Sequence, residues 1–473
     1  MTEGQFHIEP SEEPTGWMAI LLKYGIAAIV GVFFLTAALH FTYTPDETYV
    51  YLRMAKNFAD GDGLAFNMRS PSLEVPSPLW ALLLGIGAMT HIDPYIGAKT
   101  LDAVLASFSI LLLYLLALGI IRDHLFALAA AWIFSFDSWM IRWSATGLES
   151  SLAQFLTLLA LWYIFKREYS TASFILVPLW FIRPETILLY GVIVVDLYFN
   201  SHDRPTFFRI LFRSLSVFLV VFVPFAFLAI MYYGRIVPEH YFTVEQISAG
   251  KLFNAVKLVF STQGMTLLVT ITGTILALLT KSWDVFREDG FPLFWIFLLF
   301  CCSLVLAHDV FLRTSLLITP VICIYALWTI KRLEFSHVVS TTRSLTLLVV
   351  LTGLALVQNQ FLYRSTVRPY MQRYSEGVNE SIRPIAHWLN TNAEYGGKIA
   401  APEIGLLGYV SERRTYRSGQ NGYEGTVDYL ILYSTESQQV HADSLQLVMT
   451  KPAFGLSMFN PEFTYYSLYK VMR

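Results

Sequence analysis

The chain is short of charge. Only 14% of its 473 residues are charged, while 55% are hydrophobic and 15% are aromatic. Because an ordinary soluble domain carries about 25% charged residues, this composition excludes a soluble protein and predicts one that crosses a membrane several times. The net charge is −2 and the sequence shows no basic cluster, so nothing in it indicates nucleic acid as a partner.

The chain also has few cysteines, and its N-terminal residues do not show the pattern of a signal peptide. Cys301, Cys302 and Cys323 lie in apolar stretches, where a cysteine usually serves as a small core hydrophobe. The sequence therefore predicts no disulfide framework. The first 17 residues are acidic and lack the basic segment and the small-residue cleavage site of a signal peptide, so the first apolar segment is expected to remain as an anchor.

About eleven apolar segments are long enough, or nearly so, to cross a bilayer, which takes about 20 residues. Most lysines and arginines between them fall on one side, which the positive-inside rule predicts to be cytoplasmic. The other side then carries the loop after the first span and the C-terminal tail. The expected spans are residues 18–40, 97–121, 125–141, 148–165, 171–182, 185–199, 210–232, 257–280, 291–307, 311–330 and 344–362.

The first outer loop, residues 41–96, is too long for a simple connection. Apolar residues recur at helical spacing over residues 49–58, with polar residues between them, which predicts an amphipathic helix on the membrane surface that a Gly-Asp-Gly turn ends. The apolar stretch 78–89 is short for a span, and a crossing there would break the one-sided charge pattern. It is therefore expected to be re-entrant or interfacial.

After Arg364 the composition becomes polar and no further spanning segment follows. This change predicts two parts, a membrane part over residues 1–363 and a soluble α+β or α/β domain over residues 364–473. Within the second part, residues 382–389 are expected to be helical, and strands are expected at 398–401, 406–410, 429–433 and 445–450.

Two adjacent carboxylates, Asp46 and Glu47, follow the first span by only a few residues. Carboxylates at a membrane are costly to solvate and are tolerated mainly where they pair, line a water-filled cavity or take part in chemistry. The alternative is an ordinary polar loop after a helix end.

Several short motifs follow one another along the chain. They are Pro-Asp-Glu-Thr-Tyr at 45–49, Gly-Asp-Gly-Leu-Ala-Phe-Asn at 61–67, Ser-Pro-Leu-Trp at 77–80, Arg-Trp-Ser-Ala-Thr-Gly-Leu-Glu at 142–149, Arg-Pro-Glu at 183–185, Tyr-Tyr-Gly at 232–234, Arg313 ahead of Leu316, Leu317 and Pro320, and Ile-Gly-Leu-Leu-Gly-Tyr at 404–409. In their order and spacing they resemble the GT-C superfamily of polyprenyl-phosphate-sugar-dependent glycosyltransferases. The resemblance is greatest to the branch of mycobacterial arabinofuranosyltransferases and protein O-mannosyltransferase-like enzymes.

The chain departs from that pattern at two places, which leave the sugar and the acceptor open. Glu239 and His240 follow Pro238 where an Asn-Thr-like pair is usual, and Glu403 stands where the family often has aspartate.

The resemblance implies an inverting transfer of a sugar from a polyprenyl phosphate to an acceptor hydroxyl, catalysed by the part over residues 1–363. Such a reaction needs a carboxylate to accept the hydroxyl proton, and Asp46 is expected to be this base with Glu47 in support. It also needs cations for the leaving phosphate. The candidates for that role are Arg313, Arg142, Arg183 and Arg53, and the candidates for the acceptor side or its loops are Glu149, Glu239, His240, His308 and Asp309.

Each arginine also has a structural reading, since an arginine at a helix end often reaches toward lipid head groups. Arg142 and Arg183 lie near Glu149 and Glu185 in sequence and could simply pair with them.

No cofactor is expected. A divalent metal held by Glu47, His240, His308 and Asp309 is the weaker alternative, because their spacing is not that of a dedicated site. The expected partners are the lipid-linked donor, an acceptor on a glycan, lipid or protein, and membrane lipids. The expected location is the cytoplasmic (inner) membrane, with the site and the C-terminal domain outside.

Two other functions fit a protein with many spans. A transporter or flippase of lipid-linked sugars would carry intramembrane charges too, but paired repeats with broken helices, which transporters usually show, are not visible here. A structural partner in an envelope complex would need neither the carboxylates nor the arginines.

Overall fold

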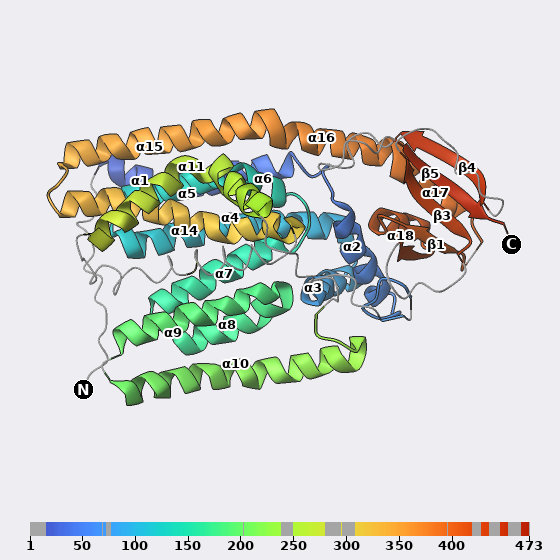
Figure 1. Ribbon diagram of the computed structural model, residues 1–473, viewed down its shortest axis with the longest axis horizontal. Coiled ribbons are helices and arrows are strands. Elements are labelled where there is room, and N and C mark those ends of the chain that lie inside the picture. The colour runs from blue at the N-terminus through green and yellow to red at the C-terminus, as the bar shows by residue number, and fades with distance from the viewer. Residues whose placement is uncertain are drawn as a thin grey trace.

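The computed structural model describes residues 16–68, 70–71, 77–201, 203–237, 249–279, 295, 308–394, 396–418, 427–434, 445–452 and 465–472. Long helices form a bundle that makes up most of the molecule, and a small sheet domain lies at one end of it (Figure 1). This arrangement confirms the predicted class, a helical polytopic membrane protein with a small C-terminal domain.

Five helical stretches among the described residues are long and apolar enough to cross a membrane, and shorter apolar helices accompany them. The expected span at 291–307 lies outside the described residues, apart from Trp295, which is helical. The bundle helices are α1 (Trp17–Ala38), α4 (Pro94–Ile121), α5 (His124–Ser135), α7 (Ser150–Phe165), α8 (Tyr169–Ile182), α9 (Leu189–Asn200), α10 (Arg204–Tyr233), α11 (Ala249–Leu279), α14 (His308–Phe335) and α15 (Thr341–Leu362).

Two expected spans are not single α-helices in the structure. The segment expected at 125–141 is divided into α5 and the short helix α6 (Ser138–Trp143), because the Asp137 carboxylate accepts hydrogen bonds from the backbone N–H groups of Trp139 and Met140 and starts a new helix. The segment expected at 185–199 begins with the 3₁₀ turn η1 (Pro184–Leu188) and continues as α9.

Helix α4 lies within the bundle and contacts α1, α5, α7 and α14. Ala98, Ala103, Ala106 and Ala117 on this helix are fully buried. Small side chains let neighbouring helices approach closely, which is how helices gain packing energy when lipid replaces water around them.

The first outer loop forms two helices, α2 (Asp46–Ala59) and α3 (Pro78–Met89), which pack against each other. Helix α2 lies between the bundle and the C-terminal domain, so much of its polar side does not face solvent. Arg53 Nε donates to the Phe66 carbonyl at 2.7 Å, and the Asn57 amide donates to the carbonyls of Ala65 and Phe66. The helix is where the sequence predicts it, but these two polar residues hold the following loop.

One helix leads from the bundle into the C-terminal domain (Figure 1). It runs 52 residues, Thr341–Asn392, through α15, the π turn η3 (Tyr363–Val367), α16 (Arg368–Gly377), the π turn η4 (Val378–Ile382) and α17 (Arg383–Asn392). Each π turn comes just before an Arg-Pro pair, at Pro369 and Pro384. Proline has no N–H and its ring crowds the preceding turn, so the helix widens there and continues. The expected domain boundary at residues 363 and 364 falls inside this helix.

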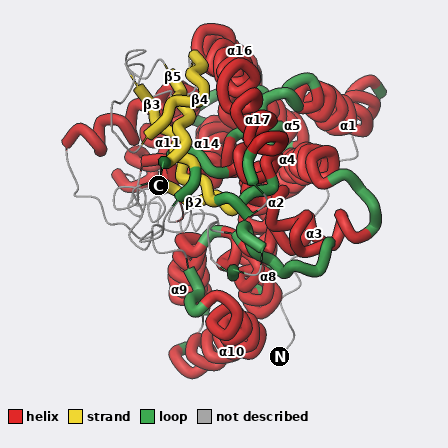
Figure 2. Tube along the Cα trace, turned by 90° about the vertical axis from the view of Figure 1, so that its right-hand side faces the viewer, coloured by secondary structure: helices red, strands yellow, loops and turns green. Residues whose placement is uncertain are grey.

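The C-terminal domain contains a five-stranded sheet in the order β2-β1-β3-β5-β4. Strand β1 is parallel to β2 and β3, and β5 is antiparallel to β3 and β4. Figure 2 looks onto this end and shows the strands over one side of the bundle, away from α10. The strands are β1 (Lys398–Ala401), β2 (Arg414–Arg417), β3 (Tyr429–Ser434), β4 (Leu445–Pro452) and β5 (Tyr465–Val471).

Three expected strands, at 398–401, 429–433 and 445–450, are confirmed. The expected strand at 406–410 is wrong, because this stretch belongs to the helix α18 (Gly405–Ser411). A short apolar run does not reveal its period, and α18 begins where Asp46, far away in sequence, binds its first N–H groups.

Candidate active site

Asp46, the first residue of α2, joins the bundle to the C-terminal domain. Its Oδ2 accepts a hydrogen bond from the Gly405 N–H at 2.7 Å, and its Oδ1 accepts one from the Leu406 N–H at 2.8 Å. Residue 405 must be glycine here, because a Cβ on it would lie 1.9 Å from the Asp46 carbonyl oxygen. The Asp46 N–H donates to the Tyr374 hydroxyl at 3.1 Å. The carboxylate therefore lies where the two parts of the molecule meet.

The surroundings of Asp46 act on the pKa of its carboxyl in opposite directions. Burial raises the pKa of its carboxyl, the two backbone N–H groups lower it, and the net result lies above the ordinary value. An ionised carboxylate has about four lone-pair positions, so the two backbone contacts leave room for a further proton or donor. A carboxylate with a raised pKa and spare acceptor positions is suited to general-base chemistry.

Glu47 lies at the open end of a chain of alternating charges. Its carboxylate accepts a hydrogen bond from Arg313 Nη2. Arg313 Nη1 lies 3.4 Å from Glu149 Oε1, and Arg183 Nη2 lies 3.3 Å from the same oxygen. Arg183 Nη1 also lies 3.8 Å from Glu185 Oε1. Buried charges are tolerated only when they are paired in this way.

The exposed fraction of the side chains falls along this series of charges from Glu47 to Glu149. The Glu47 side chain is 46% exposed, Arg313 is 10% exposed and Glu149 is fully buried. Burial raises the pKa of the Glu47 carboxyl, but the charge and hydrogen bond of Arg313 lower it further, so the net pKa lies below the ordinary value. Glu47 therefore stays ionised, and the Arg313 guanidinium lies between an exposed and a buried carboxylate.

The C-terminal domain adds two residues that the sequence analysis missed as site residues, Glu403 and Arg417. Glu403 follows β1, and its Oε1 accepts a hydrogen bond from the Tyr433 hydroxyl at 2.7 Å. Its Oε2 is buried and has no hydrogen-bond partner among the described residues. Burial raises the pKa of the Glu403 carboxyl, and the charge of Asp46 raises it further.

Arg417 is the last residue of β2, and its positive charge lowers the pKa of Asp46, Glu47 and Glu403. The position of both residues relative to the strands is a signal that could have identified them. They lie at the carboxyl ends of two neighbouring parallel strands, β1 and β2, which is where sites form in sheets of this kind.

The other expected phosphate-binding arginines are placed differently. Arg142 is buried beside the cluster, with Nη2 donating to the Tyr43 hydroxyl at 2.8 Å, and its guanidinium lies 4.6 Å from the Trp143 ring centre. The Arg313 guanidinium lies 5.5 Å from the same ring centre. Arg53 is not brought to the cluster, because its guanidinium donates to the carbonyls of Phe66 and Gly408.

Some expected residues fall outside what the structure describes. Glu239 and His240 belong to the part that is not described, while His308 and Asp309 begin α14 and their side chains are not described. Within the described residues, no group of three or more His, Cys, Asp or Glu side chains could hold a metal ion. Of the weaker metal set, only the Glu47 side chain is placed.

Replacing Glu403 with glutamine is expected to flatten the pH dependence of stability. Because its pKa is raised in the folded protein, the contribution of Glu403 to stability is full below its ordinary pKa of 4.5 and is lost as the pH rises through the raised pKa. Glutamine still accepts from Tyr433 and cannot ionise. The variant should therefore have a higher Tm than the wild type at alkaline pH and a similar Tm in acid, measured by thermal unfolding in lipid nanodiscs.

Glu412→Gln is the matched control, since the hydrogen bond from Lys56 holds the pKa of Glu412 below its ordinary value. That substitution should lower the Tm slightly at neutral and alkaline pH, the opposite sign. Parallel Tm curves for the wild type and Glu403→Gln across the pH range would show that Glu403 has the same pKa in both states.

No family model matches the sequence, and no curated protein matches it. The solved structures that resemble the chain include ArnT from Cupriavidus metallidurans bound to undecaprenyl phosphate, which matches over 86% of each protein with 13% sequence identity and a TM-score of 0.49. A likeness at this level assigns neither a family nor an activity, so the function has to be argued from the residues themselves.

Proposed function

We propose that the protein is an inverting glycosyltransferase that moves a sugar from a polyprenyl-phosphate carrier to an acceptor hydroxyl. The observation that carries this proposal is the meeting of Asp46, Glu47 and Arg313 between the bundle and the C-terminal domain. Asp46 and Glu47 belong to one motif of the GT-C resemblance, and Arg313 is a residue on which that resemblance also rests. The proposal leaves open which sugar is moved, which acceptor receives it and which branch of the superfamily is meant.

In the proposed reaction, the acceptor oxygen attacks the anomeric carbon of the sugar on the face opposite the phosphate. The bond from that carbon to the phosphate oxygen breaks, and the polyprenyl phosphate leaves with the bonding electrons. Asp46 takes the hydroxyl proton, a step typically worth about 10² to 10⁴ in rate. Burial raises the pKa of Asp46, whereas Arg313 lowers the pKa of Glu47 and already occupies its carboxylate, so Asp46 is the proposed base.

Arg313 is the proposed cation for the leaving phosphate. Glu149 is fully buried and holds one side of the guanidinium, while Glu47 on the other side is partly exposed. A guanidinium fixed in this way stabilises growing negative charge without having to reorganise during the reaction. Arg183 supports it through Glu149, and Arg142 is a second candidate for the donor phosphate. The proposal includes no metal ion, since Arg313 supplies the positive charge.

We further propose that the protein lies in the cytoplasmic membrane with α2 and the C-terminal domain outside, because the basic loops lie at the other end. In a variant without the native cysteines, a membrane-impermeant maleimide added to intact cells should modify Glu380→Cys and spare Lys166→Cys. Both positions are exposed and lie at opposite ends of the molecule. The reverse labelling would place the site on the cytoplasmic side.

The function is tested by reconstituting the purified protein with lipid-linked sugars from cells that lack it, in which its donor should accumulate. Mass spectrometry should show that one polyprenyl-phosphate sugar is consumed and free polyprenyl phosphate released when an extract of envelope acceptors is present. The new glycoside should have the anomeric configuration opposite to that of the donor. A donor that changes leaflet and stays intact would instead indicate a flippase, and an unchanged donor in the same leaflet would contradict both functions.

A further inference from the structure

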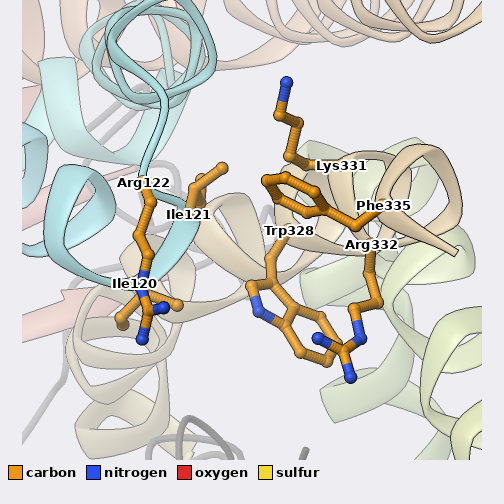
Figure 3. Close-up of a pocket in the computed structure, with 7 residues that line it drawn as sticks. All are labelled: Ile120, Ile121, Arg122, Trp328, Lys331, Arg332 and Phe335. Atoms are coloured by element: carbon orange, nitrogen blue, oxygen red, sulfur yellow. The ribbon is translucent and has the colours of Figure 1, made fainter. Parts of the chain in front are cut away.

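A hollow of about 300 Å³ lies between the last turns of α4 and α14 (Figure 3). Its apolar walls are formed by Ile120, Ile121, Trp328 and Phe335. It is far from the candidate active site, because α14 carries Arg313 near its beginning and Arg332 near its end. At 1.5 Å per residue these two arginines are about 28 Å apart along the helix, close to the roughly 30 Å thickness of a bilayer core.

The basic residues of the hollow differ in how they are paired. Lys331 is satisfied, with Asp123 Oδ2 at 2.9 Å and Glu334 Oε2 at 3.2 Å. The other oxygen of Asp123 accepts hydrogen bonds from the Leu125 and Phe126 N–H groups at the start of α5, so both oxygens of this carboxylate have partners. The guanidinium groups of Arg122 and Arg332, by contrast, make no hydrogen bond or ion pair with any residue that the structure describes.

The two arginines point into the same region. In Figure 3 the guanidinium groups of Arg122 and Arg332 extend to the same side of the hollow with the Trp328 indole between them, while Lys331 extends the other way. A cation near a helix C-terminus is favoured by the helix dipole, and this accounts for an arginine at each helix end. The helix dipole does not explain why the two guanidinium groups flank the same hollow with apolar walls.

The backbone at Arg122 supports a role for its side chain. Arg122 ends α4 in the left-handed conformation, with φ 60° and ψ 30°. Glycine adopts this conformation without strain and is the usual residue at such a helix end, whereas a residue with a Cβ is disfavoured. The arginine therefore occupies a position where glycine would be better for the helix alone.

We propose that this hollow binds the head group of an anionic phospholipid in the leaflet opposite the candidate active site. The lipid phosphate would lie between Arg122 and Arg332, and the glycerol and upper acyl chains would lie against Trp328 and Phe335. Phe335 is 59% exposed, so an apolar surface is accessible there. Basic pockets between membrane helices bind such head groups, and the apolar walls favour a lipid over free phosphate. This inference is independent of the proposed glycosyl transfer.

The test is native mass spectrometry of the full-length protein in detergent, titrated with dioleoyl phosphatidylglycerol. A basic side chain near an anionic head group is worth about fivefold in affinity, so Arg122→Gly should weaken binding about fivefold and Arg122→Gly/Arg332→Gln about 30-fold. Arg122→Gly should also keep or raise the Tm, because glycine relieves the left-handed backbone. Weaker lipid binding by a protein that is at least as stable cannot be explained by loss of fold.

Arg209→Gln/Arg213→Gln is the matched control, since it removes two exposed arginines at the start of α10, at the same end of the bundle. It should bind phosphatidylglycerol as the wild type does. Equal binding by the Arg122 variants, or equal binding of dioleoyl phosphatidylcholine by the wild type, would overturn the proposal. Displacement of phosphatidylglycerol by millimolar inorganic phosphate would overturn the assignment to a lipid and leave a phosphate site.

Discussion

Replacing Arg313 with alanine is expected to weaken binding of the lipid-phosphate sugar about 30-fold or more. Truncating one partner of a buried, hydrogen-bonded charge pair typically costs about 2 to 5 kcal/mol. Arg313→Lys should recover only part of the affinity, because an ammonium group does not reproduce the paired N–H groups of a guanidinium. Donor binding is measured by titrating a lipid-phosphate sugar into the protein in nanodiscs.

Arg313 also has a purely structural alternative, in which it only holds Glu47 and Glu149. Glu47→Gln separates the two roles. If Arg313 binds the donor phosphate, removing the competing carboxylate should preserve or increase donor affinity; if Arg313 only positions Glu47, the variant should lose as much affinity as Arg313→Ala. Lys56→Gln controls for loss of a positive charge, since Lys56 on α2 makes an exposed ion pair with Glu412.

The second large effect is expected for Asp46→Asn, which should lower turnover by about 10² or more if Asp46 accepts the hydroxyl proton. The substitution is not silent for the fold. An amide has one acceptor oxygen, so one of the two N–H groups at Gly405 and Leu406 loses its partner, and a hydrogen bond to a charged group is worth about 1.5 to 3 kcal/mol. The assay must therefore separate chemistry from domain contact.

Asn67→Ala provides that separation. The Asn67 side chain donates to the Thr415 carbonyl and accepts from the Thr415 N–H, both at 3.0 Å, so it also joins the two parts of the molecule but has no base to offer. We expect Asn67→Ala to lose stability with turnover reduced far less than in Asp46→Asn. Equal turnover in the two variants would make Asp46 a contact residue. Glu47→Gln should have a smaller effect on turnover than Asp46→Asn, and the reverse order would exchange their roles.

The membrane part could be predicted well because burial in lipid demands long apolar segments, which are visible without knowing any contact. The errors arose where a distant partner decides the local structure. Residues 406–410 are helical because Asp46 binds the N–H groups at the start of α18. Strand β2, Arg414–Arg417, was missed because its Arg-Thr-Tyr-Arg sequence has no apolar run. Its strand conformation depends on pairing with β1.

The candidate site was only partly predictable, because distant contacts also decide which residues come together in it. Asp46, Glu47 and Arg313 were identified through the motif resemblance, and the structure brings them together, although their chemical roles stay predictions. Arg53 could not be separated from them by sequence, since its partners are backbone carbonyls. Glu403 and Arg417 could not be linked to Asp46, because folding of the second domain brings them near it.

The contact between Asp46 and Gly405 also bears on how the protein is made. The two residues are 359 positions apart, and at the usual synthesis rate of about 5 to 20 residues per second the ribosome reaches the second roughly 20 to 70 s after the first. Throughout that time α2 is already at the membrane without the domain that covers it. A chain released before residue 405 has the spans and the carboxylates yet lacks both N–H donors that position Asp46. Premature termination would thus leave an inserted protein in which the Asp46 carboxylate lacks both of its backbone partners.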